Sequence, residues 1–312
     1  MRRMPIHQHP ALAGLGVFER GWLSSNNVLV YDEAGATLID TGHVNHAEQT
    51  LALVRHGLEG RPLARIVNTH LHSDHCGGNA TLQRAFGAAV FVPEASAAAV
   101  RDWSASALTF DPSGQRCERF TLQGTTRAGD MIEAGGRRFE VIEAPGHDPQ
   151  STILFDADHG LLISADALWE NGFGVVFPEL EGEPGFADVA AVLDRIERLP
   201  VQLVVPGHGA PFTDVGAALA RARSRLAAFV AEPRRHARHG AKVLMKYHLM
   251  EVREQPLDAL LQWAEGTPLF MAVWQTYGRG EAPVARDWAE LLSNELVGSG
   301  ALGRRGTQVI DV

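Results

Sequence analysis

The sequence predicts an α/β protein in which two β-sheets are packed between outer helices, followed by a smaller, mainly helical C-terminal domain. Apolar runs typical of strands alternate with helical segments through residues 1–212. The alternation falls into two comparable halves, which fits a pair of sheets. After residue 212 helical segments dominate, and 312 residues leave room for one large and one smaller domain. We therefore expect domains at 1–212 and 213–312.

The first half is expected to begin with a hairpin, because Asp32-Glu33-Ala34-Gly35 separates two apolar runs. Residues 101–127 contain proline, glycine and scattered aromatic residues, and we expect them to be irregular. The other elements expected here are strands at 22–31, 36–39 and 88–92 and helices at 46–56, 78–86 and 94–100.

The second half repeats the pattern of a strand followed by a loop, from residues 139–145 to residues 201–206. Between them we expect a helix at Phe186–Leu199, because its apolar residues recur on one face. In the C-terminal domain a helix at Val215–Glu232 is expected to stop at Pro233. Three further helices, at 242–251, 256–265 and 285–296, and a hairpin at 302–310 resemble a winged-helix module.

The most informative stretch is residues 69–78, where His70, His72, Asp74 and His75 lie within six positions. Imidazole and carboxylate groups are the usual ligands of zinc and related divalent metals. His70 and His72 are two apart, so in an extended segment they point the same way, whereas Asp74 and His75 diverge. One short loop can therefore present ligands to two neighbouring metal positions.

Three more candidate ligands follow or end apolar runs later in the chain: His147, Asp166 and His208. Such runs are typical of strands, and strand ends are the rigid positions that a metal site requires. Each of these residues alone would be an ordinary polar residue. As a set, they predict metal binding.

The chain resembles the metallo-β-lactamase-fold hydrolase superfamily from about residue 14 to residue 215. Five motifs occur in the order of that family: Leu38-Ile39-Asp40-Thr41-Gly42, His70 to His75, Ala144-Pro145-Gly146-His147, Ile163-Ser164-Ala165-Asp166 and Val204-Val205-Pro206-Gly207-His208-Gly209. The resemblance implies an αβ/βα four-layer sandwich.

The resemblance also implies a site for two divalent metal ions, with zinc expected and iron or manganese as alternatives. One ion would be held by His70, His72 and His147, and the other by Asp74, His75 and His208, with Asp166 bridging both. Asp40 would not bind metal but would orient the ligand loop. Some members of this superfamily carry a helical C-terminal domain that covers the metal site.

Two metal ions bridged by Asp166 would lower the pKa of a shared water toward neutrality. The resulting metal-bound hydroxide would cleave a thioester, lactone or ester, and Asp74 could move a proton. Asp74 and Asp166 are therefore the expected catalytic residues. We expect the enzyme to be a dinuclear metal-dependent hydrolase of a small-molecule substrate.

The segment after Asp166 is rich in aromatic residues and glycine, and with residues 101–127 it is expected to form the substrate wall. Its candidate contacts are Trp169, Phe173 and Phe177. Lys242 and Tyr247 could contact an anionic substrate if the C-terminal domain covers the site; the alternative is a solvated helix face.

Two other functions stay open: a mononuclear-iron sulfur dioxygenase, whose ligands are a subset of these, and a nuclease or nucleic-acid-binding protein. His72 stands where oxygen-reducing di-iron members carry a carboxylate, which argues against that class. Only 41 residues separate Asp166 from His208, too few for the inserted domain of many nucleic-acid-processing members. Arg304 and Arg305 of the terminal hairpin could touch phosphate.

The composition argues against nucleic acid and membrane as partners. The formal net charge is −9, and the acidic excess lies in residues 1–212. No apolar run reaches the roughly 18 residues of a spanning helix. Residues Met1–His7 are basic with no apolar stretch behind them, so no signal peptide is expected. Two cysteines make no disulfide framework, which fits a cytoplasmic protein; a homodimer stays open.

Overall fold

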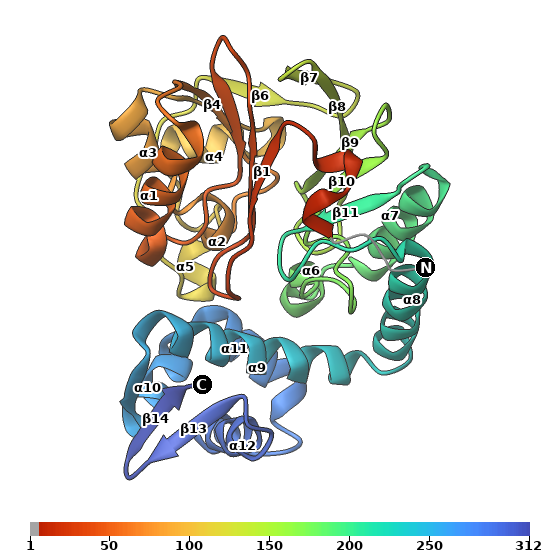
Figure 1. Cartoon of the computed structure of the whole chain (residues 1–312). Helices are drawn as coiled ribbons and strands as arrows, with labels where there is room; N and C mark the ends of the chain where they lie inside the picture. Colours follow the sequence, from red (N-terminus) through yellow and green to blue (C-terminus); the bar gives the residue numbers. More distant parts are fainter. Residues whose placement is uncertain (1–5) are drawn as a thin grey trace.

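Two facing β-sheets form the centre of the larger part of the molecule in the computed structural model, which describes residues 6–312 (Figure 1). The first sheet has the order β1 (Leu15–Phe18), β2 (Asn27–Val30), β3 (Ala36–Ile39), β4 (Leu63–Val67), β5 (Ala89–Pro93), β6 (Gly124–Thr126). The second has the order β11 (Leu203–Pro206), β10 (Leu161–Ala165), β9 (Thr152–Asp156), β8 (Arg137–Glu143), β7 (Met131–Ala134). β3 to β6 are parallel, whereas β7 to β10 are antiparallel.

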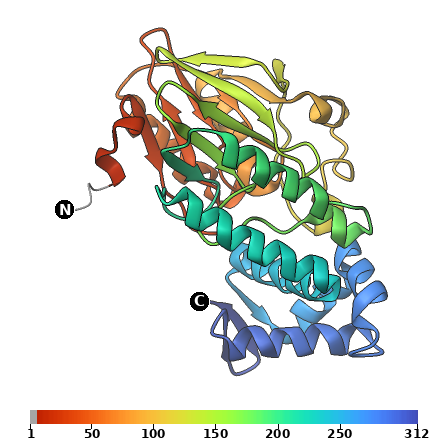
Figure 2. The same cartoon turned by 90° about the vertical axis from the view of Figure 1, so that its right-hand side faces the viewer.

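Helices cover the outer face of each sheet and complete four layers (Figures 1 and 2). α1 (Ala47–Leu58) and α3 (Asn79–Phe86) pack on the first sheet, and α7 (Phe186–Arg198) and α8 (Val215–Ala231) on the second. The helix predicted at Phe186–Leu199 is found as α7, with its apolar face buried. A separate apolar layer, which includes Val28, Val141 and Leu154, fills the space between the sheets. The predicted αβ/βα sandwich is confirmed.

The C-terminal segment packs around an apolar core that contains Phe270 and Trp288 and also includes Val175 and Leu180 from the larger part of the molecule. Its helices are α9 (Pro233–Val252), α10 (Leu257–Gly266), α11 (Pro268–Val273) and α12 (Ala285–Gly298), with a π-helical turn at Trp274–Gly278. A three-stranded sheet has the order β12 (Glu254–Pro256), β14 (Gln308–Asp311), β13 (Leu302–Arg305). The mainly helical character and the terminal hairpin agree with the prediction; the winged-helix likeness and the division at residue 212 stay predictions.

Some local predictions were wrong. The predicted break at Pro233 is found, but residues 233–241 are helical as well and belong to α9, because proline is tolerated in the first turn of a helix, whose N–H groups need no helical partner. α8 does end at Ala231, so the chain turns there and α9 starts at once. Residues 101–127 are not wholly irregular, since Phe110–Ser113 forms α5 and β6 extends the first sheet. β1 and β7 were missed.

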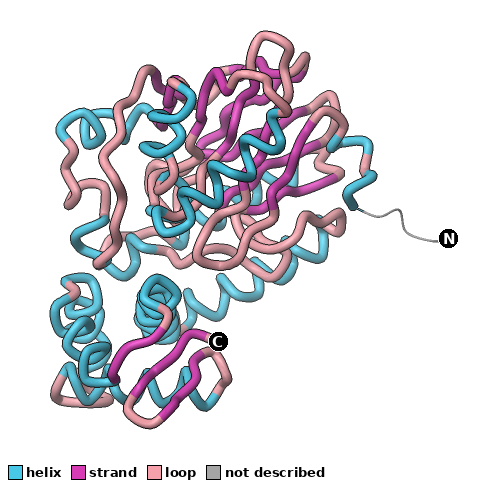
Figure 3. The backbone as a smooth tube through the Cα atoms, turned by 60° about the vertical axis from the view of Figure 1, so that its left-hand side comes forward, coloured by secondary structure: helices cyan, strands magenta, loops and turns pink. Residues whose placement is uncertain are grey.

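The candidate metal residues follow the strands β4, β8, β10 and β11; Asp74 and His75 lie in the short helix after β4, and the others lie in loops. α9 lies between this part of the sandwich and the three-stranded sheet (Figures 1 and 3). Three short helices complete the loop regions: α2 (Ser73–Cys76), α4 (Ala97–Asp102) and α6 (Phe177–Glu181). The sandwich therefore presents its loops to the C-terminal segment.

Within residues 6–312, no helix combines the length and the apolar character needed to cross a bilayer. Most of the segment Met1–His7, from which we expect no signal peptide, lies outside the described residues.

Candidate metal centre

Three buried imidazoles from two loops converge to form the first group. The Nδ1 of His72 lies 3.1 Å from the Nε2 of His70 and 2.8 Å from the Nε2 of His147. Burial lowers the pKa of His72 and of His147 to about 4. Both rings are therefore neutral near pH 7, which is the form that binds a metal ion. This group has the donor chemistry and the protonation state of a metal site.

The second group contains Asp74, His75, Asp166 and His208. The Nε2 of His208 lies 3.0 Å from an oxygen of Asp74, and the Nε2 of His75 lies 3.4 Å from an oxygen of Asp166. Among the residues described, the buried Nε2 of His75 has no hydrogen-bond partner. A metal ion would satisfy this nitrogen, so the group fits such an ion.

Asp166, a member of the second group, also lies next to the first group. Its Oδ2 is 3.4 Å from the Nε2 of His147 in the first group and 3.7 Å from the Nε2 of His208 in the second. Asp166 follows the end of β10, where Ala165 has a positive φ of 44°. A Cβ on Gly207 would lie 2.1 Å from the Oδ1 of Asp166, so only glycine leaves room for this carboxylate.

Asp40 fixes the orientation of His75 from behind the second group. Its Oδ2 lies 2.7 Å from the Nδ1 of His75, and the backbone N–H and the hydroxyl of Thr69 also donate to this carboxylate. The ring of His75 therefore turns its Nε2 toward Asp166. His147 is held similarly, since its Nδ1 donates to the carbonyl of Val175 at 2.6 Å.

The carboxylates and imidazoles of the second group shift each other's pKa values. Burial alone would lower the pKa of His75, but the nearby carboxylates of Asp166, Asp40 and Asp74 raise it well above its ordinary value. Burial would likewise raise the pKa of Asp74, yet His75 and His208 lower it to about 2. The positive charge of the His75 ring therefore offsets part of the negative charge of the neighbouring carboxylates.

A cavity of about 480 Å³ opens beside both groups and is closed on the far side by α9. Of the predicted substrate contacts, Trp169, Phe173, Phe177 and Tyr247 line it. Lys242 does not line it, because this side chain faces a neighbouring groove, where its Nζ lies 3.4 Å from Glu295. Residues 101–127 were also expected to form part of the substrate wall; in the described lining of the cavity, this segment contributes Gln115.

Aromatic side chains shield the candidate ligands on the cavity side. The ring of Phe177 lies 4.7 Å from that of His72 and 5.5 Å from that of His147. The indole N–H of Trp169 donates to Asp166 at 3.2 Å. These contacts leave an apolar chamber next to charged groups.

Trp22 and the apolar side of α9 are parts of the site that sequence reasoning missed. Trp22 is 59% exposed, and its ring stacks on His208 with centroids 5.5 Å apart. Nothing in the local sequence distinguishes this tryptophan. α9 lines the cavity with Val243, Leu244 and Met250. Their helical spacing around Tyr247 could have indicated a second apolar face.

Residues 20–208 match the family model of the metallo-beta-lactamase superfamily, and the chain belongs to this superfamily. Hydroxyacylglutathione hydrolase of Albidiferax ferrireducens is 34% identical over 176 residues, which cover 55% of this chain and 56% of that protein. Acyl-coenzyme A thioesterase MBLAC2 of Homo sapiens is 31% identical over 161 residues, covering 47% of this chain and 56% of that protein. The chain thus spans about half the length of the curated relatives it matches.

Solved structures share the fold. A metallo-beta-lactamase family protein from Thermus thermophilus superposes with a TM-score of 0.57 at 22% identity, covering 96% of this chain and 99% of that one. The BLEG-1 B3 metallo-beta-lactamase gives a TM-score of 0.53 at 22% identity over 66% of this chain and 96% of that one. The match to the Thermus protein includes most of the C-terminal segment, whereas the second match covers a smaller share of the chain.

Proposed function

We propose that this chain is a dinuclear metal-dependent hydrolase that cleaves acyl thioesters. One observation carries the proposal: two groups of side chains that could hold metal ions meet at Asp166 and open into a largely aromatic and aliphatic cavity. The names of the two relatives support a thioester substrate, since both denote removal of an acyl group from a thiol carrier. Lactones and simple esters are the alternative substrates.

The first group would hold one divalent ion and the second group the other, with Asp166 shared. Zinc is the expected metal, because imidazole and carboxylate ligands suit it, and iron or manganese are the alternatives. Divalent ions in such paired sites supply Lewis acidity and make water nucleophilic near neutral pH. The ligands proposed are His70, His72, Asp74, His75, His147, Asp166 and His208.

The side chains around the cavity supply positioning and proton transfer. Asp74 lines the cavity as an ionised carboxylate, since its pKa is about 2, and it can accept the proton of the attacking water. Water oxygen adds to the acyl carbon, the carbon–sulfur bond breaks, and the departing sulfur takes up the proton. Phe177 and Trp169 keep bulk water away from the acyl group, while the N–H of Trp169 holds Asp166 in place.

The test is metal analysis of protein purified without added metal, combined with an assay of thiol release from acyl thioesters. About two zinc or manganese ions per chain, with hydrolysis lost on chelation and restored by metal, would support the proposal. About one iron ion with oxygen consumption on persulfides would replace it by the sulfur dioxygenase. Metal-loaded protein that hydrolyses no thioester, lactone or ester would overturn it.

A further inference from the structure

A second hollow lies between α8 and α9, beside the cavity, and its described lining contains no carboxylate side chain. We call it the basic groove; it has a volume of about 670 Å³. It is lined by Arg221, Ser224, Arg225, Ala228, Phe229, Arg235, Arg238, His239 and Lys242. This cationic groove occurs in a chain whose formal net charge is −9.

Part of this positive charge has no carboxylate partner. The side chain of Arg221 donates to the carbonyl of Glu170 at 2.7 Å, and that of Arg225 donates to the Nε2 of His239 at 2.7 Å. Both acceptors are neutral. The first is a backbone carbonyl, and burial lowers the pKa of the second, His239, to about 4. Arg235 is exposed and, within residues 6–312, makes no ion pair.

The other two cations of the groove are already balanced. Arg238 pairs with Glu281 and Glu295, and Lys242 lies 3.4 Å from the same Glu295. The excess of positive charge in the groove therefore comes from the three arginines Arg221, Arg225 and Arg235.

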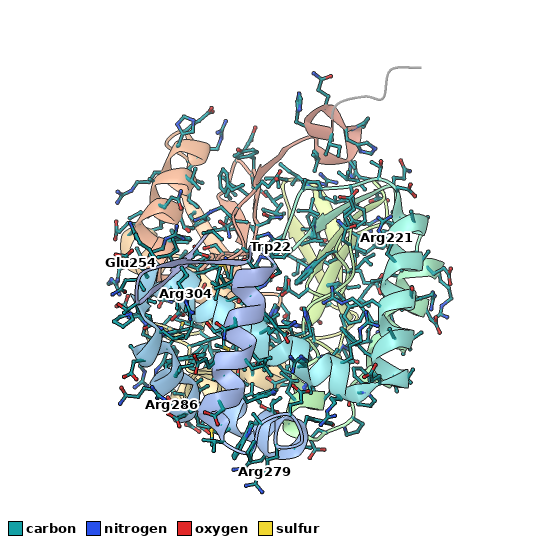
Figure 4. All side chains as sticks on the ribbon, turned by 90° about the horizontal axis from the view of Figure 1, so that it is seen from below. Trp22, Arg221, Glu254, Arg279, Arg286 and Arg304 are labelled. Atoms are coloured by element: carbon teal, nitrogen blue, oxygen red, sulfur yellow. The ribbon has the colours of Figure 1, made fainter. Side chains whose placement is uncertain are left out.

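The basic groove continues the cavity that contains the metal candidates. Arg225 and His239 line both spaces. The guanidinium of Arg225 lies over the rings of Phe173 and Phe229, 5.6 and 5.4 Å from their centroids, which fixes it at the junction. Figure 4 shows Arg221 on the α8 side and Trp22, which lines the cavity, nearer the middle of the molecule. The two spaces therefore adjoin at Arg225 and His239.

We infer that the basic groove binds the phosphate groups of a nucleotide thiol carrier whose acyl chain lies in the cavity. The inference rests on the proposed function and specifies its substrate class as acyl thioesters of the coenzyme A type. Arginine matches phosphate because its planar fork can donate two parallel hydrogen bonds. Coenzyme A carries several phosphate charges, whereas glutathione carries a single net negative charge, so three unpaired arginines suit the nucleotide better.

The test compares two substrates that share an acyl group. One is the coenzyme A thioester, and the other is the thioester of N-acetylcysteamine, which lacks phosphate. In the double variant Arg221→Gln/Arg235→Gln we expect KM for the coenzyme A thioester to rise about tenfold or more, with kcat unchanged. KM for the N-acetylcysteamine thioester should stay the same.

Arg223→Gln is the matched control, since Arg223 lies on the same helix but pairs with Asp194 and Glu197 outside the groove. It should leave both KM values unchanged. An equal rise in KM for both substrates, or the same rise in the control, would overturn the inference. A lower KM for a glutathione thioester than for the coenzyme A thioester would also overturn it.

Binding of adenosine 3′,5′-bisphosphate, measured by calorimetry, separates this inference from the proposed function. Binding to the wild type that the double variant loses would support the groove even if no thioester were cleaved. If the enzyme hydrolyses thioesters but does not bind the bisphosphate, the phosphate-binding role of the basic groove is overturned and the proposed function is not. Tighter binding of a single-stranded oligonucleotide than of the bisphosphate would assign the groove to nucleic acid and overturn the inference.

Discussion

The hydroxyl of Tyr247 lies 2.9 Å from the Oγ of Ser73, which sits between His72 and Asp74. This contact joins α9 to the loop that carries four of the candidate ligands. A second link lies nearby, where the Nε2 of His43 is 3.0 Å from Glu251 in a buried pair. The wall of the cavity is therefore attached to the loop that carries the candidate ligands.

Tyr247→Phe should lower the free energy of unfolding by about 1 kcal/mol, because it removes one buried hydrogen bond. Burial raises the pKa of the Tyr247 phenol well above its ordinary value, so the hydroxyl is a neutral donor to Ser73. Ser73 keeps its bond to Gln115 at 2.8 Å, so metal content should not change. Urea denaturation measures the free energy of unfolding and elemental analysis measures the metal content, with Tyr277→Phe as the control. A loss of metal would contradict the expectation.

Asp166→Ala and His72→Ala should differ in how much metal they lose. Asp166 lies between both groups, so its removal is expected to lower occupancy at both and to abolish activity. His72 belongs to the first group, so His72→Ala should lose about one of two ions and also be inactive. Elemental analysis checks this, with the exposed His56→Ala as the control. Full activity in both variants would refute the ligand assignment.

Asp40→Ala should weaken metal binding at the second group by about 10- to 100-fold, because His75 loses the carboxylate that orients its ring. The first group should keep its affinity, since Asp40 contacts none of the three histidines in it directly. Competition with a chromogenic chelator resolves the two affinities. Equal weakening at both groups would indicate that the whole loop has been displaced.

The two groups should respond differently to pH when the metal-free protein is loaded. The pKa of His72 and of His147 is lowered to about 4, so near pH 7 the first ion meets neutral rings and displaces no proton from them. The pKa of His75 is raised, so the second ion must displace its proton, and binding there should strengthen as pH rises. Calorimetry in buffers of different ionisation enthalpy counts the protons. Equal proton release for both ions would contradict this.

The sequence was most informative where function depends on a local pattern. The histidine cluster and the ligands after β8, β10 and β11 could be predicted, because a strand end places a side chain at the edge of a sheet. The fold class followed from the same alternation of strands and helices. The metal-binding roles of these residues stay predictions that the experiments above test.

What could not be predicted depends on how distant segments meet. The stacking of Trp22 on His208 requires both sheets to be assembled, and no nearby residue signals it. Lys242 was placed at the cavity or on a solvated helix face, but the packing of α9 turns it toward Glu295 and the basic groove. The end of a helix before Pro233 was predicted, but the start of the next helix at Pro233 was not, although proline is also common at the start of a helix.

All candidate metal ligands precede residue 209, whereas α9, which closes the cavity and forms one side of the basic groove, begins at residue 233. The candidate metal ligands and the part of the cavity wall that α9 forms therefore lie in separate stretches of the chain. A chimera that exchanged α9 alone would replace the cavity residues Val243, Leu244 and Met250 but would keep Arg221 and Arg225 of α8 in the basic groove.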